Sequence, residues 1–313
     1  QTGELFQVKE IAEDGKDLKF SKDGKHAIFT VNNKGVTISK VIELATKKEV
    51  YRIEGEALTL AGDLKIFKKT DRNKAVLKAE QARTEGTAYY SLKGKSSPKA
   101  LKLQGLVASQ FVVSNDQQFL YLLGTKSAND PSSIYRYALK DDQLTEIHST
   151  QNKKSSLAMN GKYLFFGYGQ KSDSVGIYTI ETENVRMVEG AIQDYSDTHI
   201  LVQSQLAEEK TLRVIEIKNT ANQYKSISTK NRITDAALSP TGTKVAFSMI
   251  EQSDYEVYTA DLDGNITRVS QEIQHDRFPQ FLDEQRLIAA KGEGRHRRSF
   301  MYHLGTGEVT KLF

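Results

Sequence analysis

One stretch of 37 residues, from Ile233 to Val269, constrains the fold more than any other part of the chain. It alternates short apolar runs with tight polar turns, and an Asp-Gly pair between two such runs is a strong hairpin signal. We expect four strands here, at Ala236–Leu238, Lys244–Met249, Tyr255–Leu262 and Asn265–Val269. The pattern therefore predicts a small antiparallel sheet of four consecutive strands.

The same strand–turn–strand pattern recurs seven times, at the turn pairs Asp23-Gly24, Gly62-Asp63, Asn115-Asp116, Asn160-Gly161, Ser196-Asp197, Thr241-Gly242 and Asp283-Glu284. Successive pairs lie on average about 43 residues apart, which is the length of one four-stranded propeller blade. We therefore predict an all-β fold, a seven-bladed β-propeller of four-stranded antiparallel blades. The predicted blades span about residues 16–55, 56–105, 106–152, 153–189, 190–230, 231–272 and 273–313.

These blades make residues 16–313 one predicted domain, and two segments are left open. Residues 1–15 contain a strand-like run at Phe6–Ile11, which either pairs onto the last blade and closes its edge or belongs to a linker. Asn73–Arg83 has helical composition and is either a short helix or a strand and loop. The chain begins at Gln1, so we expect either that a leader was removed or that a longer sequence was trimmed.

Composition excludes several classes of site. The chain has no cysteine, which excludes disulfides, thiolate metal ligands and cysteine nucleophiles. Its net charge is only +4, far from the basic excess of a nucleic-acid-binding protein, so we expect no nucleic-acid partner. No apolar run reaches the ~18 residues of a membrane span, so no transmembrane segment is expected in this chain.

Two polar segments of the last predicted blade are the candidate binding residues. The loop Lys291–Arg298 contains two glycines and a basic cluster able to hold a phosphate or an acidic surface: Arg295, His296, Arg297 and Arg298. His275 and Arg277 precede the first strand of the same blade, where propellers place residues that face the axial channel. The alternative is that both segments are ordinary solvated loops.

No catalytic or metal-binding set emerges from the sequence. The six histidines do not form an H-E-x-x-H pair or another close metal spacing, and no G-x-S-x-G element is present. We therefore predict no catalytic residues, no metal ligands and no cofactor.

Two elements resemble the repeats of TolB-type propellers. Phe20–Lys25 and Leu238–Lys244 are similar to the "FSPDGK" element of that family, and Val257–Gly264 is similar to its "IYxxDLxxG" element. The chain has no tryptophan, so it lacks the "WD" signature of typical WD-repeat proteins. The resemblance implies an exported, periplasmic protein that binds protein partners in bacterial envelope complexes. Related propellers also precede serine-peptidase domains.

The sequence thus predicts a non-catalytic propeller that serves as a protein-binding scaffold in a bacterial envelope or cell-surface complex. Two alternatives stay open. One is a metal-dependent hydrolase or lyase with its site in the axial channel. The other is the regulatory propeller of a larger multidomain peptidase or receptor.

Overall fold

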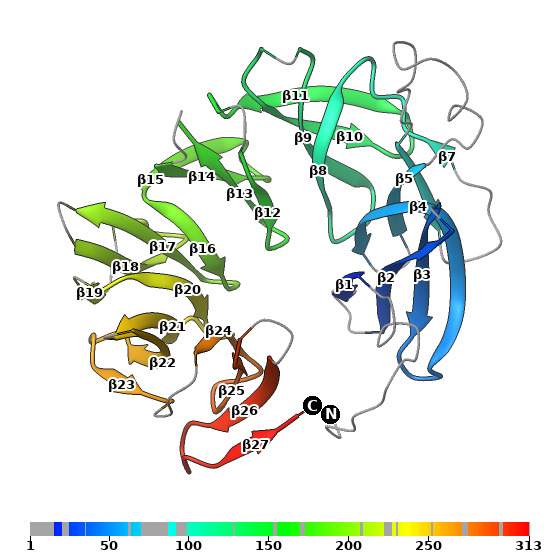
Figure 1. Ribbon diagram of the computed structural model, residues 1–313. Helices are drawn as coiled ribbons and strands as arrows, with labels where there is room; N and C mark the ends of the chain where they lie inside the picture. Colours follow the sequence, from blue (N-terminus) through cyan, green and yellow to red (C-terminus); the bar gives the residue numbers. More distant parts are fainter. Residues whose placement is uncertain are drawn as a thin grey trace. The chain divides into compact units, whose positions relative to one another are not determined.

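The computed structural model describes residues 16–20, 25–34, 36–61, 64–69, 87–91, 99–127, 129–152, 155–169, 173–206, 209–221, 227–229, 231–251, 253–270, 275–293 and 297–312. All secondary structure in these ranges is β-strand, which is drawn in Figure 1. Two predicted segments, Phe6–Ile11 and Asn73–Arg83, lie outside the described residues. The chain divides into two compact units, residues 1–149 and 150–313, and each is described by itself.

The first unit begins with a sheet of seven strands in sequence order. They are β1 (Lys16–Phe20), β2 (His26–Asn33), β3 (Val36–Glu43), β4 (Lys48–Ala61), β5 (Leu64–Lys69), β6 (Thr87–Ser91) and β7 (Lys99–Ala100). This sheet corrects the prediction of seven separate blades, because the first two predicted blades are joined. The 14-residue strand β4 continues across their predicted boundary. Its first half pairs with β3 and its second half with β5, so that no turn separates the two groups.

The other sheet of the first unit has four strands, β8 (Val107–Val113), β9 (Phe119–Thr125), β10 (Ser133–Ala138) and β11 (Gln143–Ser149). Its apolar side chains form a core with residues that follow β7. Leu120, Leu122 and Tyr137 are completely buried there, and Leu101 and Leu106 pack in the same cluster. The Tyr137 hydroxyl lies 2.8 Å from Asp142 Oδ1, so the buried ring keeps a polar partner.

The second unit holds four sheets of four consecutive antiparallel strands. The first two comprise β12 (Leu157–Met159), β13 (Tyr163–Tyr168), β14 (Ser174–Thr179), β15 (Asn184–Glu189), β16 (Ala191–Tyr195), β17 (His199–Leu206), β18 (Glu209–Glu216) and β19 (Ile227–Thr229). The last two comprise β20 (Ile233–Leu238), β21 (Lys244–Glu251), β22 (Asp254–Asp261), β23 (Ile266–Arg268), β24 (Asp276–Phe281), β25 (Arg286–Lys291), β26 (Arg298–His303) and β27 (Val309–Lys311). The described residues therefore form six sheets in all.

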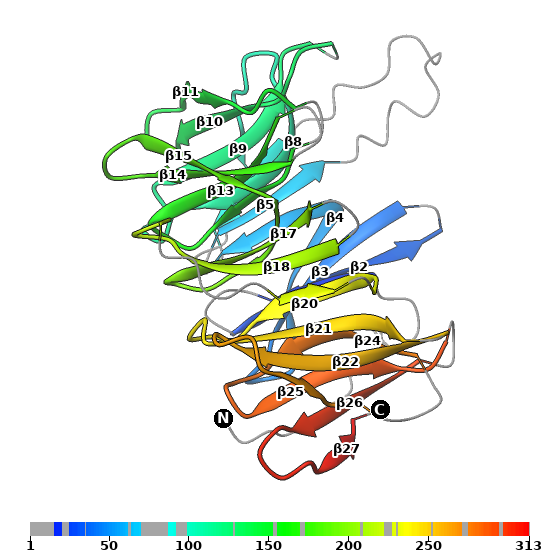
Figure 2. The same ribbon diagram turned by 90° about the vertical axis from the view of Figure 1, so that its left-hand side faces the viewer.

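Successive sheets of the second unit lie one upon another, as Figure 2 shows for β17–β18, β20–β22 and β24–β26. Their apolar side chains form shared clusters. Leu201 and Leu212 of one sheet meet Val245 and Phe247 of the next in one cluster. The second strands β13 and β21 are buried on both faces, which explains their continuous apolar runs, whereas β25 is buried at alternate positions. Buried apolar side chains thus join the last two sheets.

A β-bulge recurs in the first strand of most sheets. One extra residue shifts the register between Ala108 and Gln110 in β8, between Ile192 and Asp194 in β16, and between Ile233 and Asp235 in β20. In β24 the shift lies between Arg277 and Gln280 and includes two residues, Phe278 and Pro279, as does the shift between Lys16 and Lys19 in β1. A bulge bends its strand and redirects the side chains beside it.

Candidate binding site on the last two sheets

Arg277, at the bulge of β24, is held by a carboxylate of the preceding sheet. Its Nε lies 3.0 Å from Asp235 Oδ2, and its Nη2 lies 3.3 Å from Asp235 Oδ1. Such a two-point contact orients the guanidinium as well as balancing its charge. The guanidinium carbon also lies 4.5 Å from the centroid of the Tyr255 ring, within the range of a cation–π contact. Arg277 is therefore fixed in place rather than extended into solvent.

Phe278 follows Arg277 and has an unusual backbone. Its φ is +58°, and among the described non-glycine residues with positive φ it is the one aromatic residue and the one inside a strand. A bulky side chain is disfavoured at a positive φ. The following Pro279 also disfavours helical backbone conformations of Phe278. Even so, 41% of Phe278 is exposed.

Two guanidinium groups lie against this exposed ring. The guanidinium carbon of Arg277 is 4.6 Å from the Phe278 ring centroid, and that of Arg297 is 5.2 Å from it. Arg297 is itself exposed, and no carboxylate of the described residues forms a salt bridge with it. We call Arg277, Phe278 and Arg297 the Arg–Phe–Arg cluster. It combines an apolar surface with a cation at its rim.

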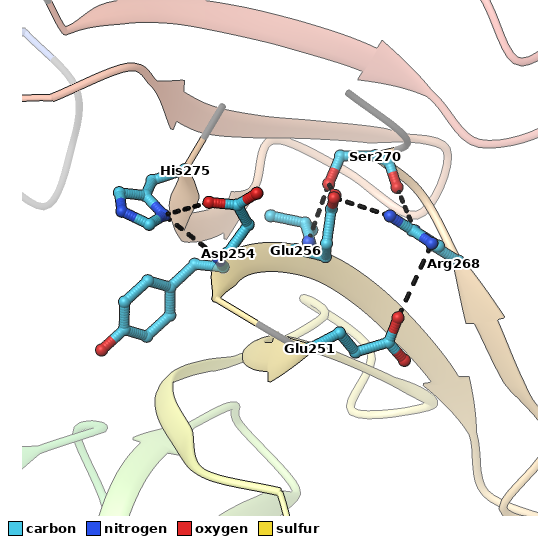
Figure 3. A network of polar contacts seen from close by, with 8 residues as sticks. Glu251, Asp254, Glu256, Arg268, Ser270 and His275 are labelled. Atoms are coloured by element: carbon cyan, nitrogen blue, oxygen red, sulfur yellow. Dashed lines mark hydrogen bonds and ion pairs between the residues drawn. The ribbon is translucent and has the colours of Figure 1, made fainter. Parts of the chain in front are cut away.

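His275 ties the beginning of β24 to two neighbouring turns. The backbone N–H of Tyr255 donates to His275 Nδ1 over 3.2 Å, and Asp254 Oδ1 lies 3.5 Å from the same nitrogen, as Figure 3 shows. On the other side, Nε2 lies 2.9 Å from Glu293 Oε1 in the β25–β26 connection. Since Nδ1 accepts the backbone proton, this geometry assigns the ring proton to Nε2, which donates to Glu293.

The structure thus brings the two predicted segments together in part. Arg277 and Arg297 contact the same ring, that of Phe278, while His275 contacts Glu293 in the connection between β25 and β26. Arg298 is exposed at the beginning of β26 and donates from Nη1 to the carbonyl of Arg297 over 2.8 Å. Arg295 and His296 lie outside the described residues. The described part of the site therefore contains four of the six predicted residues.

Sequence reasoning missed four contributors: Asp235, Tyr255, Phe278 and Glu293. Asp235 had a detectable signal, because an aspartate stands at the matching bulge position of the preceding sheet. There Asp194 accepts a hydrogen bond of 2.8 Å from the backbone N–H of Leu238 in β20. Burial raises the pKa of Asp194, and this hydrogen bond and that from Tyr195 partly oppose the rise. Both aspartates thus link their own strand to the first strand of the next sheet.

A second arginine cluster, drawn in Figure 3, surrounds a buried carboxylate, while the Arg268 side chain itself is 40% exposed. Arg268 Nη2 lies 2.6 Å from Oε1 of Glu256, which is only 3% exposed. Ser270 donates to the other oxygen of Glu256 over 2.5 Å and accepts the backbone N–H of Val257 over 2.9 Å. The buried carboxylate has a partner at each oxygen, so we assign this cluster to stability.

Two features of the described ranges bear on the predicted partners. Within the described ranges, no three or more His, Asp or Glu side chains form a group that could hold a metal ion. The same ranges contain no helix long and apolar enough to cross a membrane.

Comparisons with known proteins identify the fold. No protein-family model and no curated protein matches the chain. Among solved structures, the β-propeller domain of the Trilobed protease from Pyrococcus furiosus matches with a TM-score of 0.58 and 14% identity, over 96% of this chain and 95% of that chain. Dipeptidyl peptidase 4 of Porphyromonas gingivalis matches with a TM-score of 0.68 and 10% identity, over 98% of this chain and 54% of that chain. A structure described as the eukaryotic initiation factor matches with a TM-score of 0.63 and 15% identity, over 96% and 78%.

These likenesses confirm an all-β propeller with four-stranded antiparallel blades, here with six sheets rather than seven. At such low identity they concern the fold alone. The chain spans about half the length of the Porphyromonas peptidase that it matches, since it covers 54% of it.

Proposed function

We propose that this chain is a protein-binding propeller that regulates a peptidase, either within one polypeptide or in a complex. The observation that carries the proposal is its likeness to peptidase propellers, those of the Trilobed protease and of dipeptidyl peptidase 4. A propeller that covers a hydrolytic site restricts which polypeptides reach that site. In this proposal the chain contributes binding and access, and a separate domain contributes the hydrolysis.

The full natural reading frame and its protein product test this proposal. We expect a hydrolase domain in the reading frame, or a hydrolase that co-purifies in fixed stoichiometry with the propeller. A covalent serine-hydrolase probe should label that polypeptide, and removal of residues 1–313 should increase cleavage of a folded protein relative to a short peptide. A reading frame without such a domain, together with no labelled partner, would overturn the proposal.

A second candidate is a scaffold in a bacterial envelope or cell-surface assembly, with the chain exported to the periplasm. It is favoured by the TolB-type elements at Phe20–Lys25 and Leu238–Lys244 and by the exposed Arg–Phe–Arg cluster. Both candidates require a protein partner and differ in whether a hydrolase is attached. Fractionation of the source cells tests the export, because a periplasmic protein is released with the outer compartment and a cytoplasmic protein is not.

A further inference from the structure

We infer that the Arg–Phe–Arg cluster is a docking site for an extended segment of a partner protein that carries an acidic side chain beside an apolar one. The inference deepens the proposed protein-binding function and rests on it. Three observations carry it: the backbone of Phe278, its exposure, and the charge balance around its ring.

The backbone conformation of Phe278 is not a requirement of the bulge. The shift in β1 has the same length as that in β24 and includes Asp17 and Leu18, neither of which has positive φ. The shorter shifts in β8, β16 and β20 include Ser109, Gln193 and Thr234, again without positive φ. The sheet ladder can therefore form around the bulge without a left-handed residue. A strained, bulky residue persists only where its surroundings hold it, and such residues gather at binding and catalytic sites.

The exposure of Phe278 supports the same reading. Among the large hydrophobic residues that the structure shows to be exposed, it is the one aromatic. An aromatic ring offers a large rigid contact area at low conformational cost, which is why aromatic and arginine side chains dominate the energetic centres of interfaces. The contacts with Arg277 and Arg297 hold the ring before any partner arrives. The anchor is thus preorganised.

The charges around the ring determine the chemistry of the partner. Arg277 is balanced by Asp235, and the carboxylate of Glu293 contacts His275. Among the described residues, Arg297 therefore supplies a cation for a ligand at the rim of the ring. A carboxylate of the partner would pair with Arg297 while a neighbouring apolar side chain covers Phe278.

Fluorescence anisotropy with three labelled peptide pools tests this inference on the full chain. The pools share length and a Gly/Ser background and contain neighbouring Glu and Leu, Gln and Leu, or Lys and Leu. We expect the Glu/Leu pool to bind at least about fivefold more tightly than the Gln/Leu pool, with a preference that weakens as salt increases. Equal binding of the Glu/Leu and Gln/Leu pools, or no binding of any pool, would overturn the inference.

Matched variants locate the binding. Phe278→Asn and Arg297→Gln should each weaken Glu/Leu binding at least about fivefold. Leu282→Asn, at another exposed apolar residue, and Arg52→Gln, at another exposed arginine, should leave it unchanged. Asn tolerates the left-handed region, so the melting temperature of Phe278→Asn should equal or exceed that of the wild type. A fall in melting temperature of more than about 5 °C would assign Phe278 to the core instead.

The two proposals fail separately. If Phe278→Asn loses the peptide selectivity and the reading frame contains no hydrolase, the docking site is supported and the peptidase proposal is rejected. A hydrolase in the reading frame, with a propeller that does not distinguish the peptide pools, would retain the proposed function and remove the docking site.

Discussion

The two arginine clusters of the last sheets, one around Arg268 and one around Arg277, differ in what the arginine side chain contacts. Arg268 satisfies Glu256, a carboxylate that is 3% exposed, and its neighbour Ser270 completes the internal network. Arg277 pairs with the partly buried Asp235 and turns its remaining surface toward the exposed ring of Phe278. The two arginines thus differ in their partners: Arg268 pairs with a buried carboxylate, and Arg277 pairs with a partly exposed one and contacts the exposed ring of the proposed docking site.

The largest expected loss of stability follows from a change in the cluster of Arg268, Glu256 and Ser270. Arg268→Ala leaves the Glu256 carboxylate buried beside one remaining side-chain donor, so we expect a loss of about 2 kcal/mol in the free energy of unfolding. Urea denaturation measures this loss. The double variant with Glu256→Gln should recover part of it, because the buried charge is then gone. A loss no larger than that of Arg277→Ala would remove the distinction between the clusters.

The pair of Asp235 and Arg277 should be worth less, about 1 kcal/mol, because the Asp235 side chain is partly exposed whereas that of Glu256 is buried. A double-mutant cycle with Asp235→Asn and Arg277→Gln measures the coupling. Asp235→Asn should also weaken binding of the Glu/Leu peptides, since it releases the guanidinium that supports Phe278. A coupling free energy near zero would mean that Asp235 does not hold Arg277 in solution.

Removal of Arg297 should have a smaller effect on the fold, about 0.5 kcal/mol, which is typical of an exposed cation–π contact. The effect of Arg297→Gln on the free energy of unfolding should disappear in a Phe278→Leu background, which lacks the aromatic face. If the loss is unchanged in that background, Arg297 stabilises the fold through another contact.

The smallest effect concerns Asp194, at the bulge that matches Asp235. Burial raises its pKa in the folded state above the ordinary value of 3.8, so the folded protein retains this proton when the unfolded chain has already lost it. The stabilisation that comes from protonated Asp194 is therefore fully present below the pKa of this group in the unfolded chain. It is lost as the pH rises through the pKa of the same group in the folded protein. We expect the stability of the wild type relative to Asp194→Asn to fall as pH rises from 3.5 to 6, in ~0.5-unit steps of urea denaturation. A rise over that interval would contradict the assigned direction.

Much of the fold could be predicted because hydrophobic alternation and turn residues are local signals. The stretch Ile233–Val269 became strands β20 to β23, and Gly242 in its first turn has the positive φ, +77°, that the turn requires. The joining of the first two predicted blades could not be predicted, because a 14-residue strand that serves two partners has the same alternation as two short strands. Pairing partners are a property of the tertiary structure.

The site was predictable only in its charged residues. His275, Arg277, Arg297 and Arg298 stood out as polar groups around the first and third strands of the last sheet. Phe278 did not, because an aromatic residue in a strand normally packs in a core, and neither its exposure nor its φ can be read from composition. The decisive residue of the proposed docking site is thus the one whose backbone departs from the local rule.

The bulge repeated along the first strands also bears on how such a protein acquires new specificity. In β8, β16 and β20 the bulge includes one residue outside the ladder, which is Ser109, Gln193 and Thr234 respectively. A substitution at one of these positions changes the outward chemistry while the sheet beneath stays intact. These positions can therefore be substituted one at a time, by evolution or by design, to change binding specificity without changing the strand pairing.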